Sequence, residues 1–360
     1  MKPDETSLRE NNFDVIRFIL ACAVVFSHSY ALGLGDESGE PFNMMLGVSS
    51  GNLAVKGFFV ISGFLILRSW DRRRSWMDYL RKRIVRIYPG WLAVNVLTIA
   101  VLASLSITTF SEVVAWLPKA VLLWRFQTAG AFEGNAFPEA INGSLWSIPF
   151  EFACYLLLLA LGLLGVLART RWLLAATALT LLTSLAKDLG GAFDAFQIHP
   201  TIGRTVATSS FFLVGACAYR LRDFVQYNWI GAACCFLGLC VTSFVPLANQ
   251  VILPITLAYL LFGLAFQRRV CLHRFGKHGD FSYGIYLYAF PIQQIIVWSQ
   301  GGTMNPLALF AISAPLSIAA GIGSWFAVER WFLSRRRLKP METASPSPAS
   351  EDTRIAVELP

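Results

Sequence analysis

Long apolar segments separated by short polar ones constrain this chain more than any other feature. Ten mostly apolar runs, each of 15 residues or more, follow one another between Phe13 and Phe332. An α-helix needs roughly 20 apolar residues to cross a bilayer, and most of these runs approach that length. Only 14% of the 360 residues are charged, whereas a soluble protein has about 25%. The sequence therefore predicts an all-α polytopic membrane protein with about ten transmembrane helices.

The apolar runs also set the expected domain boundaries. A shorter apolar piece, 112–124, contains Pro118 and is expected to form an interfacial or re-entrant segment. Residues 1–12 are expected to be a cytoplasmic segment and 13–333 the membrane domain. The tail 334–360, rich in Ser, Pro, Ala and Glu, is expected to be disordered and cytoplasmic. The expected spans are 13–34, 53–67, 88–108, 145–168, 172–186, 205–219, 229–245, 251–266, 281–298 and 307–332.

The distribution of basic residues predicts the orientation in the membrane. The net charge is +8, and the Lys and Arg residues lie between the apolar runs, which is typical of cytoplasmic loops and not of a nucleic-acid-binding surface. With both termini inside, 24 of the 30 basic residues, including eight in and around 71–87, fall on the cytoplasmic side. We therefore expect a multi-pass protein of the cell (inner) membrane, with the lipid bilayer as its partner and no nucleic acid.

Three ionisable residues in the first span need a reason to be there, because charges inside a membrane are costly. Asp14, Arg17 and His28 occupy this span, and Arg17 and His28 are eleven residues apart. At about 100° per residue they share one helix face, roughly 16 Å apart along the axis. They are candidates for catalysis. Alternatively, Arg17 extends to the cytoplasmic interface and His28 is a hydrogen-bonded interior histidine.

Two further sites could carry chemistry. Arg83 and Arg86 are three residues apart before the third span, and on a helix two such guanidinium groups can hold a phosphate or pyrophosphate. The alternative is a topogenic loop that contacts anionic lipid. Glu151 and Tyr155 share a helix face at the start of the fourth span. Glu151 is a candidate catalytic carboxylate, or a structural partner of another span. No spacing of His, Cys, Asp or Glu predicts a metal site.

Taken together and in order, these stretches resemble the acyltransferase type 3 family, bacterial integral-membrane O-acyltransferases that modify cell-surface and secreted glycans. The resemblance covers the chain from residue 13 to about 332. Two departures are visible. Many members carry a His where this chain has Ala289, and a frequent Pro near the end is Trp331 here. The matching stretches are 13–17 with His28, 57–64, Arg83 and Arg86 with Tyr88-Pro89, 145–147 with Glu151 and Tyr155, 282–287, and Glu329.

The resemblance implies an acyl-CoA donor, most simply acetyl-CoA, on the cytoplasmic side, and a glycan or glycolipid hydroxyl as acceptor. It implies that Arg17 and His28 are the essential pair and that Arg83 and Arg86 bind the donor. A neutral His28 suits a general base, although it could instead carry the acyl group itself. Asp14, Arg17 or Glu151 would orient the base or stabilise developing charge. The alternatives are a transporter or flippase of a lipid-linked sugar, and a non-catalytic relative that acts as a sensor.

Overall fold

The structure is a computed structural model that describes residues 11–72, 74–138, 140–190, 199–244, 250–267 and 272–334. Within these ranges the chain is helical and contains no β-strand, which confirms the expected all-α class. The N-terminal segment and the C-terminal tail expected from the sequence lie almost entirely outside the described residues.

Each of the ten apolar runs forms a helix. Among the described residues, five helical segments are long and apolar enough to cross a membrane: Phe13–Leu34, Ser50–Arg72, Trp76–Ser104, Gly143–Leu163 and Pro306–Leu333. The other runs form shorter or less apolar helices, so the count of ten spans stays a prediction. The ten helices are α2 (Phe13–Leu34), α4 (Ser50–Arg72), α5 (Trp76–Ser104), α7 (Ser147–Leu163), α8 (Thr170–Gly190), α10 (Pro200–Arg220), α11 (Trp229–Phe244), α12 (Ile252–Ala265), α13 (Ser282–Ser299) and α14 (Pro306–Ser324).

Short helical pieces connect or extend these helices. The last long helix continues through a π-helical turn, η5, into α15, which includes Trp331 and ends at Ser334. The segment expected to be interfacial contains α6, which begins after a capping box between Thr109 and Glu112. The short elements are α3 (Pro41–Leu46), α6 (Phe110–Ala120), η1 (Gly143–Trp146), η2 (Val166–Ala168), η4 (Phe275–His278), η5 (Trp325–Glu329) and α15 (Arg330–Ser334).

The third span was expected to begin at Tyr88, after the basic stretch 81–86, but its helix begins earlier and includes that stretch. Helix α5 already begins at Trp76, where the Ser75 hydroxyl accepts a hydrogen bond from the backbone N–H of Asp78 at 3.4 Å. The Asp78 carboxylate pairs with Lys82 one turn later at 2.8 Å, which supports helix in this polar turn. Arg83 and Arg86 therefore lie on a rigid helix that continues into the membrane domain.

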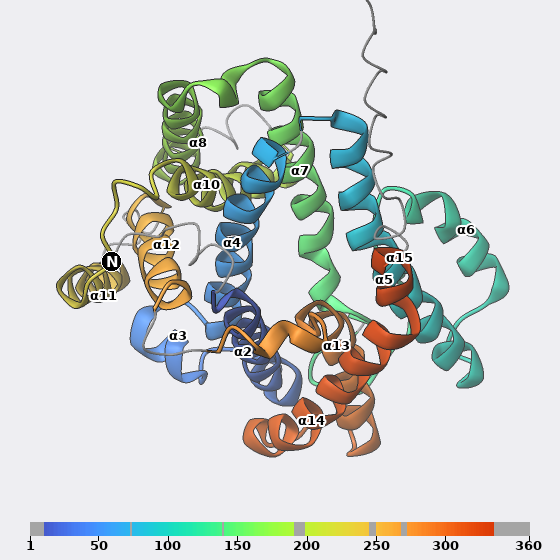
Figure 1. The fold of residues 1–360 in the computed structure, drawn as a ribbon. Helices are drawn as coiled ribbons and strands as arrows, with labels where there is room; N and C mark the ends of the chain where they lie inside the picture. Colours follow the sequence, from blue (N-terminus) through green and yellow to red (C-terminus); the bar gives the residue numbers. More distant parts are fainter. Residues whose placement is uncertain are drawn as a thin grey trace, which may run out of the picture.

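Helices α2, α4, α5, α7 and α13 surround the centre of the bundle, with α10 beside α4 and α7, α8 beside α10, and α14 beside α13 (Figure 1). Helices α4 and α10 cross closely because glycines face the partner backbone. A β-carbon at Gly63 would collide with the Phe212 carbonyl, and one at Gly215 with the Val60 carbonyl. Small residues at such crossings let backbones approach in a membrane.

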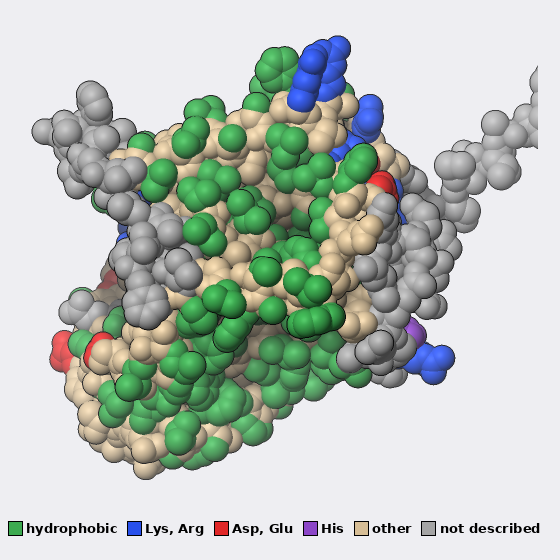
Figure 2. All heavy atoms as spheres, turned by 90° about the vertical axis from the view of Figure 1, so that its left-hand side faces the viewer, with side chains coloured by type: hydrophobic (Ala, Val, Ile, Leu, Met, Phe, Trp, Pro, Cys, Tyr) green, Lys and Arg blue, Asp and Glu red, His purple; other side chains and the backbone are tan. Residues whose placement is uncertain are grey.

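The outer surface of the bundle is apolar. Figure 2 shows hydrophobic side chains across the face that includes α11 and α12, with most of the visible charged side chains near its margins. On α11, Trp229 and Leu237 are 79% and 64% exposed. Large exposed apolar areas of this kind are unfavourable in water and favourable against lipid. The surface therefore agrees with a multi-pass membrane protein.

Candidate functional site

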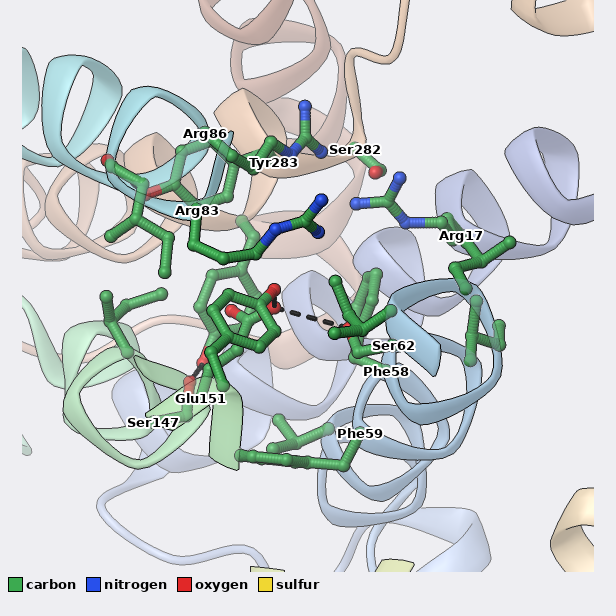
Figure 3. A pocket seen from close by; sticks show the side chains of 18 residues that line it. Arg17, Phe58, Phe59, Ser62, Arg83, Arg86, Ser147, Glu151, Ser282 and Tyr283 are labelled. Atoms are coloured by element: carbon green, nitrogen blue, oxygen red, sulfur yellow. Dashed lines mark hydrogen bonds between the residues drawn. The ribbon is translucent and has the colours of Figure 1, made fainter. Parts of the chain in front are cut away.

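A cavity lies between α2, α4, α5, α7 and α13 (Figure 3). It brings together four of the six residues predicted from the sequence, although they come from three helices that are distant in the chain. The lining includes Arg17 from α2, Phe58 and Ser62 from α4, Arg83 and Arg86 from α5, Ser147, Glu151 and Tyr155 from α7, and Ser282, Tyr283 and Tyr286 from α13. Asp14 and His28 are not part of this lining.

Asp280, which precedes α13, joins two of the arginines. Its carboxylate forms ion pairs with Arg17 and, at 2.5 Å, with Arg86. The backbone N–H of Ser282 donates to the same carboxylate at 3.2 Å, which fixes its position at the start of the helix. Burial acts to raise the pKa of Asp280, but Arg17 and Arg86 outweigh burial and hold the pKa well below its usual range. Asp280 is therefore ionised at neutral pH.

Asp280 is not among the residues predicted from the sequence, because it lies just outside the expected span 281–298. The available signal was a single acidic residue directly before an aromatic apolar helix. Glu329 entered only as a residue of the family resemblance. The structure places Glu329, 2% exposed, 4.0 Å from Arg86, and the Ser324 hydroxyl donates to it at 3.1 Å. Glu329 ends the π-helical turn, a feature that often occurs at functional sites.

Arg83 differs from Arg86 in its charge environment. Its guanidinium lies over the rings of Tyr79 and Tyr155, 5.6 Å from each centroid, and its Nη2 is 3.4 Å from the Ser69 hydroxyl. Among the residues that the structure describes, Arg83 forms no ion pair. Figure 3 shows the guanidinium groups of Arg83 and Arg17 directed toward each other across the cavity. Arg83 is therefore a cation that a bound anion could neutralise.

Glu151 lies at the centre of the lining and receives two hydrogen bonds. The Tyr155 hydroxyl donates to Glu151 Oε1 at 2.5 Å, and the Ser62 hydroxyl from α4 donates to the same oxygen at 3.3 Å (Figure 3). The shared face expected for Glu151 and Tyr155 is confirmed. Glu151 therefore bonds another span, as the structural alternative expected, and it also lines the cavity, while its catalytic role stays a prediction. Nearby, the hydroxyls of Ser147 and Tyr286 hydrogen-bond at 2.7 Å.

His28 lies on the same side of α2 as Arg17 but farther along the helix. Arg17 pairs with Asp280, and the His28 ring meets the Phe290 ring edge-on at 5.2 Å between centroids. Phe290 belongs to α13, and Asp280 lies just before the start of that helix. Arg17 and His28 therefore both face α13, which is the common face predicted for them. His28 Nδ1 is buried and has no hydrogen-bond partner in the described ranges. The hydrogen bond that the alternative interpretation expects is thus not observed at His28 Nδ1.

Asp14 and Ala289 have simpler surroundings. The Asp14 carboxylate lies against the backbone of η4, where a β-carbon at Gly276 would collide with it. Ala289 is fully buried and packs with Ala21 and Val25 of α2. The position at which many relatives of the resembled family carry a His thus faces α2 between Arg17 and His28. In this chain it serves close packing of the two helices.

Comparison with known proteins adds evidence of a different kind. Residues 10–328 match the family model described as an acyltransferase domain. An O-acetyl transferase of Shigella phage Sf6 is 27% identical over 358 residues, which cover 91% of this chain and 97% of that protein. Nodulation protein 10 of Rhizobium leguminosarum bv. viciae is 31% identical over 169 residues, 43% of this chain and 45% of that protein. No solved structure shows a significant match to the chain.

Proposed function

The chain belongs to the acyltransferase type 3 family, and we propose its reaction from that membership. We propose that it moves an acyl group, most simply acetyl, from acyl-CoA on the cytoplasmic side to a hydroxyl of a cell-surface or secreted glycan or glycolipid. The observation that carries the proposal is the cavity in which Arg83, without a carboxylate partner in the described chain, lies near Glu151. The protein is proposed to lie in the inner membrane with both termini in the cytoplasm.

The donor is proposed to bind through Arg83. Coenzyme A carries phosphates, and an Arg–phosphate contact is a strong charge-assisted hydrogen bond. Arg86 is expected to contribute less direct binding, because Asp280 at 2.5 Å and Glu329 at 4.0 Å already balance its charge. Its role is to hold the arginine side of the cavity together with Arg17. This assignment divides the predicted phosphate-binding pair into one binding residue and one supporting residue.

The chemical step needs a base, because a sugar hydroxyl is a poor nucleophile near neutral pH. His28 is proposed for this role, either as a general base or as a carrier of the acyl group. When it acts as a base, the hydroxyl oxygen attacks the thioester carbonyl, the hydroxyl proton passes to the imidazole, and the thiolate of coenzyme A leaves. Arg17 is proposed to stabilise the negative charge that develops on the thioester oxygen, and Glu151 to orient the cavity side chains that hydrogen-bond to it. Asp14 is proposed to anchor the start of α2 against η4.

Mass spectrometry of surface glycans tests the proposal most directly. Glycans from cells with and without the protein should differ by the mass of one acyl group per modified residue. Purified protein in lipid vesicles should also release free coenzyme A from acetyl-CoA when a glycan acceptor is present. A flippase of a lipid-linked sugar would change the location of the glycan without changing its mass and would release no coenzyme A.

A further inference from the structure

We propose that Asn142, Ser144 and Gln293 form, with His28, the subsite that binds hydroxyl groups of the acceptor sugar. This inference rests on the proposed function and deepens it, because it assigns residues and a chemical class to the acceptor side of the same enzyme. The part of the acceptor that this subsite binds is a neutral sugar ring with several hydroxyl groups. The subsite is distinct from the arginine-lined cavity proposed for the donor.

Unpaired polar atoms are the first observation. Asn142 Oδ1, Ser144 Oγ, Gln293 Oε1 and His28 Nδ1 are buried, and none has a hydrogen-bond partner in the part of the chain that the structure describes. Asn142 is 3% exposed, and Ser144 and Gln293 are fully buried. Leaving a buried polar group unpaired costs about 1–3 kcal/mol, so four such atoms in one region require an explanation.

The residues that carry these atoms are His28 and near neighbours, in the chain, of two positions at one aromatic side chain. The Phe290 ring meets the His28 ring at 5.2 Å and abuts Gly143, the residue between Asn142 and Ser144. Gln293 follows Phe290 by one helical turn on α13. Phe290 therefore has both His28 and the segment at the start of η1 as direct neighbours. The four residues thus lie at one end of the interface between α2 and α13.

The remaining hydrogen bonds hold the two amides in place. Asn142 Nδ2 donates to the Leu287 carbonyl at 2.9 Å. Gln293 Nε2 donates to the Val25 carbonyl at 2.9 Å and to the hydroxyls of Ser29 at 2.9 Å and Ser313 at 3.1 Å. The amide donors are thus occupied by the protein, whereas both amide oxygens are left to accept. Val25 and Ser29 flank His28 on α2, so Gln293 is fixed beside the histidine.

The chemistry of these atoms identifies the kind of ligand. Amide oxygens only accept hydrogen bonds, a serine hydroxyl accepts or donates, and a neutral imidazole offers one accepting nitrogen. A sugar ring presents several hydroxyl donors at close spacing and carries no charge, which matches such a set. A phosphate or carboxylate would instead place its own hydrogen-bond acceptors against the accepting amide oxygens. The cavity near Arg83 has the opposite character, since guanidinium groups donate and bind anions.

Gln294 provides a matched control next to Gln293. It is also fully buried, but its amide is satisfied within the protein. Its Nε2 donates to the carbonyls of Phe137 and Ala140 at 2.8 and 2.7 Å, and its Oε1 accepts from Asn135 at 2.7 Å. Substitution of Gln294 should therefore affect stability and not acceptor binding.

The test measures KM separately for donor and acceptor, with purified protein in lipid vesicles. The donor is acetyl-CoA, and the acceptor is base-treated, de-O-acylated glycan from host cells that lack this protein. Ser144→Ala and Gln293→Met should each raise the acceptor KM about three- to tenfold, the range of one neutral hydrogen bond, with the acetyl-CoA KM within about twofold of wild type. Gln294→Met should lower the melting temperature and leave the acceptor KM unchanged.

Ser144→Ala keeps the test decisive if Gln293→Met fails to accumulate. Its hydroxyl has no partner in the described protein, so its removal should leave the melting temperature unchanged or raise it while acceptor binding weakens. Wild-type acceptor KM in Ser144→Ala, or an equal rise in both KM values, overturns the subsite. If the wild-type enzyme transfers no acetyl group to this glycan, the proposed function fails, which is a separate result.

Discussion

Asp280 accepts a charge-assisted hydrogen bond from Arg86 at 2.5 Å, although 194 positions separate the two residues in the chain. Arg17, from the first long helix, pairs with the same carboxylate. Two arginines with separate expected roles, one catalytic and one in donor binding, thus share one acidic partner. This arrangement leaves Arg83 as the arginine of the cavity whose charge is available to a ligand, and it determines how the following variants should differ.

Asp280→Asn should lower the free energy of unfolding by roughly 3–5 kcal/mol, because it removes the carboxylate that the partly buried Arg17 and Arg86 share. Since the pKa of Asp280 is depressed by Arg17 and Arg86 despite burial, its contribution is present above the unfolded pKa and is lost as pH falls toward the folded one. Thermal unfolding in detergent should show a constant difference from wild type above about pH 5 and a shrinking one below about pH 4.

The control for this variant is Asp223→Asn. Asp223 is 63% exposed and lies 3.7 Å from Arg222, so its ion pair should contribute about 0–1 kcal/mol. A pH-independent difference between Asp280→Asn and wild type down to about pH 2 would contradict the assigned ion pairs.

Arg83→Ala should raise the KM for acetyl-CoA roughly ten- to a hundredfold, the value of one charge-assisted hydrogen bond, with little loss of thermal stability. Arg86→Ala should lower thermal stability as well, because it leaves the Asp280 and Glu329 carboxylates with one cation fewer. Steady-state kinetics and melting temperatures of the two variants, at matched abundance, separate the roles. Equal effects of both variants on donor KM and on stability would refute the assignment of donor binding to Arg83 and of a supporting role to Arg86.

His28→Gln should be as inactive as His28→Ala while both insert at wild-type level. Gln cannot take up a proton or carry an acyl group near neutral pH, whereas His can. Because His28 Nδ1 has no hydrogen-bond partner in the described ranges, the substitution should cost little stability. Transfer to glycan is measured by acetyl incorporation, with His199→Gln, at the exposed start of α10, as control. Substantial turnover in His28→Gln would move the base to Glu151.

Glu151→Gln should lower kcat for transfer about ten- to a hundredfold, because it removes the negative charge but preserves the size of the side chain. Tyr155→Phe should have a smaller effect, since the Ser62 hydroxyl still donates to Glu151 Oε1 at 3.3 Å. Steady-state rates at saturating donor and acceptor compare kcat of the two variants. If Glu151→Gln keeps wild-type kcat, Glu151 serves only to bond α7 to α4.

The predicted topology is tested with single cysteines in a background without the seven native ones. Arg74→Cys, in the exposed turn before α5, should react only with membrane-permeant reagents, because the basic residues around it favour the cytoplasm. Ser38→Cys, in the exposed turn after α2, should also react with impermeant reagents in intact cells. Labelling of the cysteine at 74 from outside would reverse the orientation and place the donor cavity on the other side.

Patterns local to one helix were predictable from the sequence. Apolar length predicted the helices, and α2 begins at Phe13 and ends at Leu34, as expected. Helical spacing predicted that Glu151 and Tyr155 share a face, and they hydrogen-bond at 2.5 Å. Both predictions depend on the helical repeat alone, which relates residues a few positions apart in any α-helix. The helix of the third span begins at Trp76 and not at the expected Tyr88, because the Ser75 cap and the Asp78–Lys82 pair stabilise helix in a stretch that is too polar to be predicted as a span.

Relations between helices were decided only by the tertiary structure. The sequence by itself determined that Arg17, Arg83 and Glu151 needed a reason to be in or near a membrane, but not that they line one cavity. It contained no sign that Asp280 joins Arg17 to Arg86. The physical reason is that an apolar face specifies burial but not its partner, since lipid and neighbouring helices are equally apolar. Close packing and pairing of buried charges select the arrangement of helices, and through it the site.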